Sequence, residues 1–177
     1  FRRGLEGARR ALARGLVAAG HDVSEGGAAA ALVEMAAAGG LGVRADLPPP
    51  PAAGRGGGGG ARYWAPALFG EDPALLLEVA PRHRAAFLEV LQEEGAEAIA
   101  IGRSTRRPWI HISVGGQPAV EGPTARWRRR WERGSLRLER RQTAPAAVLQ
   151  EARTAPGRRG KGGALPRWRV PFAPPAG

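Results

Sequence analysis

The chain has 177 residues, 43% of them hydrophobic, and a formal net charge of +11. Its length is typical of one domain with a tail, and its lack of cysteine excludes disulfides and thiolate metal sites. No apolar run reaches the roughly eighteen residues of a membrane span, and the N-terminus shows no signal peptide, so we expect a cytoplasmic protein.

The positive charge is concentrated in the second half of the chain. Residues 1–100 hold 10 Arg against 12 Asp and Glu, whereas residues 101–177 hold 16 Arg and one Lys against 4 Glu. So strong a bias toward arginine, with the excess of Gly, Ala and Pro, indicates base-composition pressure on the coding sequence. We therefore give the charge little weight as a sign of a nucleic-acid partner.

The first element expected is a surface helix that packs on a core and ends near Gly20. Its apolar stripe consists of Leu5, Ala8, Leu12 and Leu16, spaced three or four residues apart. Arginines occupy the opposite side of this helix.

Residues Gly20 to Gly27 read Gly-His-Asp-Val-Ser-Glu-Gly-Gly and precede an alanine-rich segment. Asp22 offers a hard oxygen to magnesium, and Ser24 can donate a hydrogen bond to a phosphate oxygen. Gly26 and Gly27 allow the backbone to approach an anion at the start of a helix. The pattern predicts Asp22 as a metal ligand and Ser24, Gly26 and Gly27 as nucleotide-binding residues. A structural interpretation stays open, since Asp and Ser before a helix also act as N-caps and paired glycines as a tight turn.

The next segments are a buried helix over about 28–38, ended by Gly39 and Gly40, and a short strand over 41–45. A low-complexity insertion follows at 47–61, with four prolines and then five glycines in succession. The elements expected after it are a short helix over 62–69, a turn over 70–73, a central strand over 75–79, and a helix from Pro81 to Gly95.

The last third predicts a buried strand over 98–101 and a half-buried strand over 110–114. A hairpin turn at Gly115 and Gly116 leads into a returning strand. A helical segment follows from Pro123. The order of elements is typical of an α/β domain with a mixed sheet and helices packed on it. We expect the domain at 1–122, the helical segment at 123–152, and a disordered Arg/Gly/Pro-rich tail at 153–177.

Several blocks of this sequence, in order, resemble the large phosphoribosylformylglycinamidine synthase family of purine biosynthesis. The blocks are Gly20–Gly27, Leu32–Ala36, Gly39–Gly42, Leu68–Pro73 and Leu75–Val79, followed by Trp131-Glu132, Ser135, Gln142 and Pro145. The match is to the second C-terminal-type synthetase domain, the lobe shared with aminoimidazole ribonucleotide synthetase. It covers roughly Leu5 to Glu151 and is most specific in its first block.

The resemblance implies a carbon–nitrogen ligase with glutamine as amido donor. The family converts formylglycinamide ribonucleotide, glutamine and ATP into formylglycinamidine ribonucleotide, with Mg2+ and ATP bound by the Asp and Ser of the first block, here Asp22 and Ser24. It implies as partners the remaining synthetase and glutaminase domains, with no membrane. Because the chain has no cysteine, glutamine hydrolysis cannot occur in it, and we expect an inactive fragment of a larger enzyme.

Two alternatives stay open at this point. One is an Arg/Trp-rich nucleic-acid-binding module built on Arg126 to Arg141 and the tail, although its spacing matches no recognised module. The other is a different synthetase of the same superfamily.

Overall fold

The computed structural model describes residues 1–50 and 61–154. The five glycines of the predicted insertion lie outside these residues, and so does almost all of the predicted tail. The chain separates into two compact units, Phe1–Arg133 and Gly134–Gly177. Over the described ranges, no helix combines the length and apolar character needed to cross a membrane.

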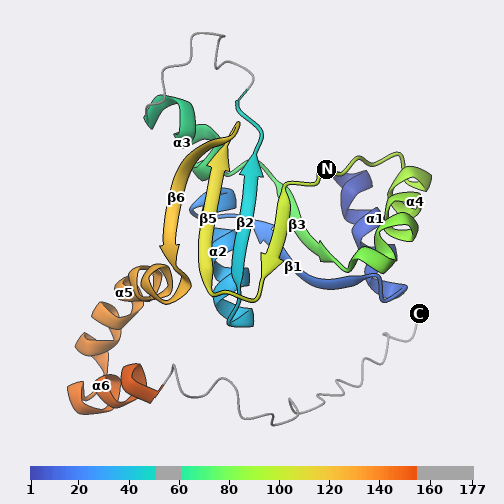
Figure 1. Cartoon of the computed structure of the whole chain (residues 1–177). Helices are drawn as coiled ribbons and strands as arrows, with labels where there is room; N and C mark the ends of the chain where they lie inside the picture. The colour runs from blue at the N-terminus through green and yellow to red at the C-terminus, as the bar shows by residue number, and fades with distance from the viewer. Residues whose placement is uncertain (51–60, 155–177) are drawn as a thin grey trace, which may run out of the picture. The chain divides into compact units, whose positions relative to one another are not determined.

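Helices and strands alternate along the first unit (Figure 1), which confirms the predicted α/β class. In chain order they are α1 (Arg2–Ala13), β1 (Val17–Val23), α2 (Gly27–Gly39), β2 (Gly42–Leu47), α3 (Ala61–Phe69), β3 (Ala74–Val79), η1 (Pro81–His83), α4 (Arg84–Glu93), β4 (Gly102–Thr105), β5 (Trp109–Val114) and β6 (Gln117–Pro123). Helix α5 (Thr124–Gln142) begins in the first unit and ends in the second, which also contains α6 (Pro145–Thr154).

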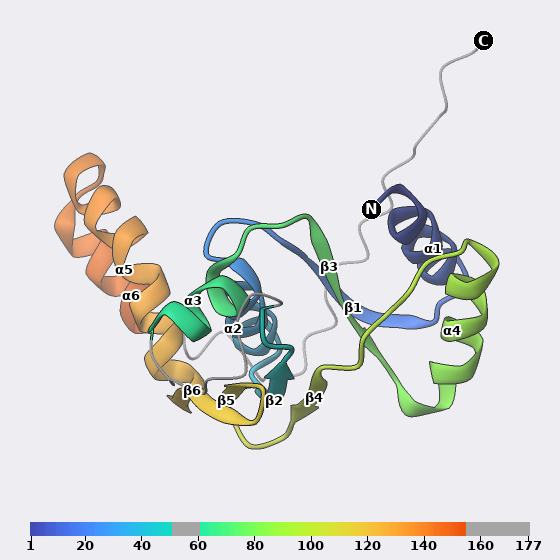
Figure 2. The same cartoon turned by 90° about the horizontal axis from the view of Figure 1, so that it is seen from above.

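The strands form two sheets of different size. Strands β1 and β3 pair antiparallel as a two-stranded sheet, and four strands form a mixed sheet in the order β4-β2-β5-β6. In the larger sheet β2 and β5 run parallel, while the other two pairs are antiparallel. Helices α2 and α3 lie on one side of this sheet (Figure 2).

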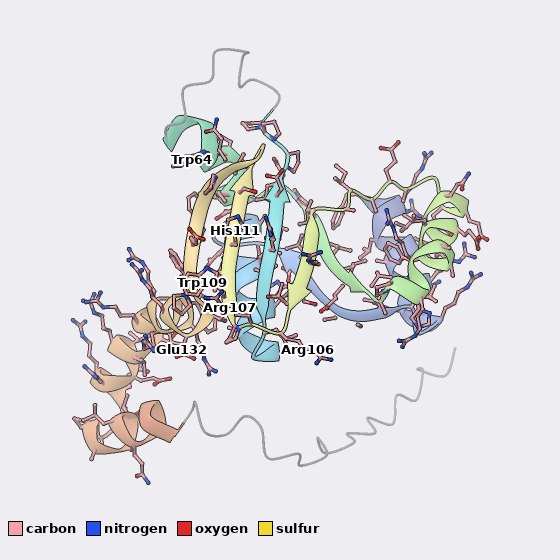
Figure 3. The ribbon with its side chains drawn as sticks, in the orientation of Figure 1. Trp64, Arg106, Arg107, Trp109, His111 and Glu132 are labelled. Atoms are coloured by element: carbon pink, nitrogen blue, oxygen red, sulfur yellow. The ribbon has the colours of Figure 1, made fainter. Side chains whose placement is uncertain are left out.

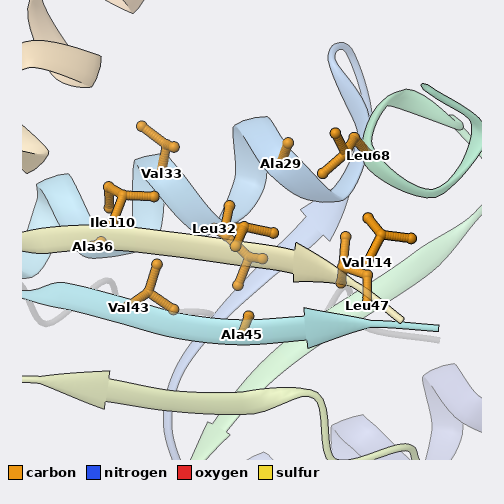
Figure 4. Packing of buried hydrophobic residues seen from close by; sticks show 11 residues of the cluster. Ala29, Leu32, Val33, Ala36, Val43, Ala45, Leu47, Leu68, Ile110 and Val114 are labelled. Carbon is orange, nitrogen blue, oxygen red and sulfur yellow. The ribbon is translucent and has the colours of Figure 1, made fainter. Parts of the chain in front are cut away.

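The main core lies between the four-stranded sheet and helix α2 (Figure 4). Ile110, Ile112 and Val114 of β5 are 0% exposed, and they alternate with His111 and Ser113 as a one-sided strand requires. A second cluster joins α1 to α4 through Ala11, Leu16, Phe87, Val90 and Leu91. The strongly apolar α2 is buried on most sides, as predicted from its sequence.

The predicted extent of the first helix is wrong. Helix α1 ends at Ala13, because Gly15 adopts a left-handed φ of 68° and the Leu16 N–H turns back to the Ala11 carbonyl. Strand β1 then begins at Val17. Of the expected apolar stripe, Ala8 and Leu16 are buried, but Leu5 and Leu12 are 51% and 56% exposed.

Two strand predictions also need correction. The run over 75–79 is a strand, yet within the described ranges β3 pairs only with β1 and is not central. The run over 98–101 is not a buried strand, since Ile99 is 73% exposed and β4 starts only at Gly102. Gly102 is the residue at which β4 begins to pair with β2, and a Cβ added there would lie 2.1 Å from the Arg44 carbonyl oxygen.

The hairpin between β5 and β6 is confirmed, with Gly115 and Gly116 at positive φ. Asp46 of β2 fixes its turn. The Asp46 Oδ1 accepts hydrogen bonds from the Ser113 Oγ at 2.7 Å and from the Gly116 N–H at 2.9 Å. The Gly116 backbone N–H, followed by Ser113, holds the pKa of Asp46 below its usual value.

This geometry predicts an acid-sensitive hairpin. Because the folded pKa of Asp46 is depressed, its contribution to stability is present above the unfolded pKa of about 3.9 and is lost as the pH falls through the folded value. We expect Asp46→Asn to lower the melting temperature at pH 7 and to flatten its decline between neutral and acid pH. Thermal unfolding monitored by circular dichroism at several pH values measures both effects. Asp72→Asn, at an exposed turn carboxylate, serves as the control, and an equal flattening there would contradict the assignment.

Candidate functional site

Asp22 and Ser24 lie at the end of β1, next to the start of α2. Asp22 pairs with Leu75 of β3, and its side chain is 69% exposed. Ser24 is the first residue after the strand and is also exposed. The carboxylate and the hydroxyl are therefore two residues apart, one near the end of the strand and one directly after it. Neither is sealed under apolar side chains.

The glycines shape the turn into α2. Gly26 and Gly27 have φ values of 82° and 65°, in the left-handed region that favours glycine. The Gly27 N–H donates to the Ser24 carbonyl at 2.9 Å. A Cβ on Gly27 would lie 2.6 Å from the Leu68 carbonyl oxygen and 2.7 Å from the Phe69 backbone. The close approach of α3 to α2 therefore explains Gly27 without any anion, a reason that the sequence alone did not suggest.

The structure does not support the alternative that Asp22 and Ser24 are helix caps. The N-cap of α2 is Gly26, and no side chain makes a capping hydrogen bond there. Asp22 belongs to a strand, five residues before the helix begins.

A carboxylate that sequence reasoning did not assign lies at the helix start. The Gly26 N–H donates to the Glu71 Oε1 at 3.2 Å, so Glu71 places a negative charge near the positive end of α2. Glu71 follows α3 in the segment Leu68–Pro73, which is one of the blocks that carry the resemblance. The β1–α2 turn and the α3–β3 connection thus form one side of the site together.

His21 lies beside the predicted metal ligand and faces α2. Its Nε2 is 2.9 Å from the Glu34 Oε2, and its Nδ1 is 2.6 Å from the Asp22 carbonyl oxygen. The hydrogen bond to the Asp22 backbone, and after it Glu34, raises the pKa of His21 against the opposing effect of burial. These contacts fix the backbone on which the Asp22 carboxylate is carried.

The donor set at this site fits magnesium only with help from other groups. Within the part of the chain that the structure describes, no cluster of three or more His, Cys, Asp or Glu side chains could enclose a metal ion. Magnesium commonly takes one or two protein carboxylates and completes its shell with phosphate oxygens and water. An exposed Asp22 beside an exposed hydroxyl is compatible with that arrangement.

Comparison with known proteins gives a consistent set of relatives. Residues 4–114 match the family described as AIR synthase related protein, C-terminal domain. The human phosphoribosylformylglycinamidine synthase is 32% identical over 154 residues, which cover 85% of this chain and 11% of that protein. The solved Thermotoga maritima PurL complexed with ATP is 18% identical, with a TM-score of 0.57 over 70% of this chain and 21% of its own. The corresponding complex with FGAR has a TM-score of 0.53 at 16% identity, with 70% of this chain and 20% of its own covered. The chain thus spans only about a tenth of its curated relative's length.

Proposed function

Because the chain belongs to the family described as AIR synthase related protein, C-terminal domain, we propose that it is the nucleotide-binding lobe of a phosphoribosylformylglycinamidine synthase. In this proposal the whole enzyme uses ATP to join an amide nitrogen from glutamine to formylglycinamide ribonucleotide. The relatives' names and the ATP and FGAR complexes of the Thermotoga protein support the assignment. The chain contributes one lobe, and with no cysteine it leaves glutamine hydrolysis to another part of the enzyme.

One observation carries the proposed binding site: Asp22 near the end of β1 and Ser24 directly after the strand are both exposed, shortly before the N-terminus of α2. Asp22 would supply one oxygen to a magnesium ion, and Ser24 would donate to a phosphate oxygen. The first turn of α2, beginning at Gly27 after the Gly26 cap, orients its N–H groups and the positive end of the helix dipole toward that anion.

The N–H of Gly26 is already bonded to Glu71, and that of Gly27 to Ser24. In the proposal Gly26 and Gly27 therefore contribute mainly by fixing the direction of the turn, while Asp22 and Ser24 make the polar contacts. Bound Mg-ATP would supply the phosphoryl group that activates the amide oxygen of the ribonucleotide. This chain's own task is to hold and orient the phosphates.

The proposal predicts that Asp22→Asn weakens magnesium-dependent ATP binding about tenfold or more, because a charged metal contact is lost. Calorimetric titration of the chain with ATP, with and without magnesium, measures the effect. Ser24→Ala is expected to weaken ATP binding by a smaller factor in both conditions.

Glu89→Gln, which removes one exposed carboxylate from α4, is the matched control and should bind as the parent does. If Asp22→Asn lowered the melting temperature while leaving ATP affinity unchanged, Asp22 would be a structural residue and the proposed site would be wrong.

A further inference from the structure

The four-stranded sheet has a second face that carries charged side chains. The buried residues of β2 and β5 point toward α2, so their alternate neighbours Arg44, Asp46 and His111 lie on the opposite face. Among the described residues of the first unit, no helix covers that face of the sheet in Figures 1 and 2. Figure 3 shows Trp109 and His111 on β5, with Arg107 at the lower end of the sheet.

A single row of side chains crosses this open face. Arg103 of β4 pairs with Arg44 of β2, Arg44 pairs with His111 of β5, and His111 pairs with Glu121 of β6. Residues directly opposite each other have Cβ atoms about 5 Å apart. Two arginines are therefore held side by side at one end of the row.

The acidic residues around this pair are engaged elsewhere. Asp46 accepts from Ser113 and Gly116, and Glu121 lies 3.3 Å from the His111 Nδ1. Glu78 of β3 accepts from the Ser104 Oγ at 2.5 Å. Among the residues that the structure describes, Arg44 and Arg103 form neither an ion pair nor a hydrogen bond through their side chains, and both are exposed.

Such an arrangement conflicts with the stability of the sheet by itself, because like charges directly opposite on paired strands repel. Local conflicts of this kind are expected where a site serves a ligand. A carboxylate between the two guanidinium groups would replace this repulsion by charge-assisted hydrogen bonds, because each planar guanidinium can donate two parallel N–H groups to a carboxylate. We propose that Arg44 and Arg103 form a docking site for a carboxylate of an acidic protein segment that lies across the open face of the sheet.

The surroundings favour a protein segment over a nucleic acid. Asp46 and Glu121 lie on the same face as the arginines. A nucleic acid carries a charge at every phosphate and would meet both carboxylates along the sheet, whereas a protein segment needs a carboxylate only at the arginine pair. Trp109 has one face of its ring covered by Arg107, whose Cζ is 4.9 Å from the ring centroid, which leaves less of it for a base to stack on. Tryptophan and arginine are, however, enriched where proteins bind one another. This proposal is independent of nucleotide binding at Asp22.

The proposal makes an unusual prediction about stability. In chloride solution Arg44→Gln should raise the melting temperature of the chain by about 1–3 °C, because it removes the repulsion. With a saturating, end-capped hexaglutamate peptide at the same ionic strength, the order should reverse, with the parent chain more stable than the variant.

Binding is measured directly by fluorescence anisotropy of the labelled peptide. Arg44→Gln and Arg103→Gln should each weaken the affinity about tenfold, while Arg129→Gln, at an exposed arginine of α5, should change it less than twofold. The Arg129 variant controls for general attraction to a basic chain.

Three results would overturn the proposal. The first is a lower melting temperature of Arg44→Gln in chloride, and the second is a loss of affinity in Arg129→Gln as large as in Arg44→Gln. The third is that a 20-nucleotide poly(U) RNA binds more tightly than the peptide and that Arg44→Gln loses this RNA binding. The face would then be a nucleic-acid surface.

Discussion

A Gly27→Ala variant is expected to lose about 2–5 kcal/mol of unfolding free energy. The left-handed φ of 65° costs a residue with a Cβ about 1–2 kcal/mol. The new methyl group would also lie 2.6 Å from the Leu68 carbonyl oxygen and 2.7 Å from the Phe69 backbone, and overpacking of this kind adds about 1–3 kcal/mol. The obstacle is backbone, which cannot rotate away as a flexible side chain can. Urea denaturation followed by far-UV circular dichroism measures the loss.

Gly116→Ala is the matched control for this change. Gly116 has a similar φ of 80°, but an added Cβ there would meet nothing within 4 Å. It should therefore cost only the conformational part, about 1–2 kcal/mol. Equal losses in the two variants would show that α3 does not press on Gly27, and the glycine would then be free to serve an anion. If Gly27→Ala loses more stability than Gly116→Ala, as expected, weaker ATP binding by Gly27 variants would result from lost folding and not from a lost contact with ATP.

The sequence was most informative where the signal is local. The apolar segment that became α2, the glycines that end it, and the hairpin at Gly115 and Gly116 each follow from a few adjacent residues. Strand β5 was equally clear, because Ile110, Ile112 and Val114 alternate with polar residues. Local backbone preference and local burial agree in these segments, so neighbouring residues suffice to define them.

Long-range pairing was not predictable in the same way. An apolar run such as Leu75 to Val79 fits a central strand as well as a strand of a two-stranded sheet, because its pattern does not show how many neighbours it has. The spacing of Leu5 and Leu12 correctly indicated a helix, but spacing cannot show whether a stripe is covered. In this chain α4 packs beside it, on Gly7 and Ala11.

The same distinction between local and long-range signals applies to the candidate site. The two-residue spacing of Asp22 and Ser24 before a helix is visible in the sequence, and the structure leaves both residues exposed. The contact of Glu71 with Gly26 and the pressure of α3 on Gly27 depend on a segment more than forty residues away in sequence. Only folding brings these groups together, so the sequence motif suggested a ligand-binding reason for a glycine that packing already requires.

The second large effect is expected at the centre of the main core, where Ile112→Ala should lower the unfolding free energy by about 3–5 kcal/mol. Ile112 is 0% exposed and lies on the middle strand pair, between Ala45 of β2 and Val120 of β6. Truncation removes three buried carbons and leaves a cavity that the flanking strands cannot close without breaking their ladders. Chemical denaturation of the purified chain measures the change.

Ile99→Ala provides a control with the same chemical change. The sequence predicted both isoleucines to lie in strands that contribute to the core, yet the structure leaves Ile99 73% exposed. Its truncation should therefore change stability by less than about 0.5 kcal/mol. A comparable loss at both positions would mean that residues 98–101 are buried, as the sequence pattern suggested. A loss confined to Ile112 would show that β5, and not the run before β4, anchors the sheet on α2 and so holds the helix whose N-terminus adjoins Asp22 and Ser24.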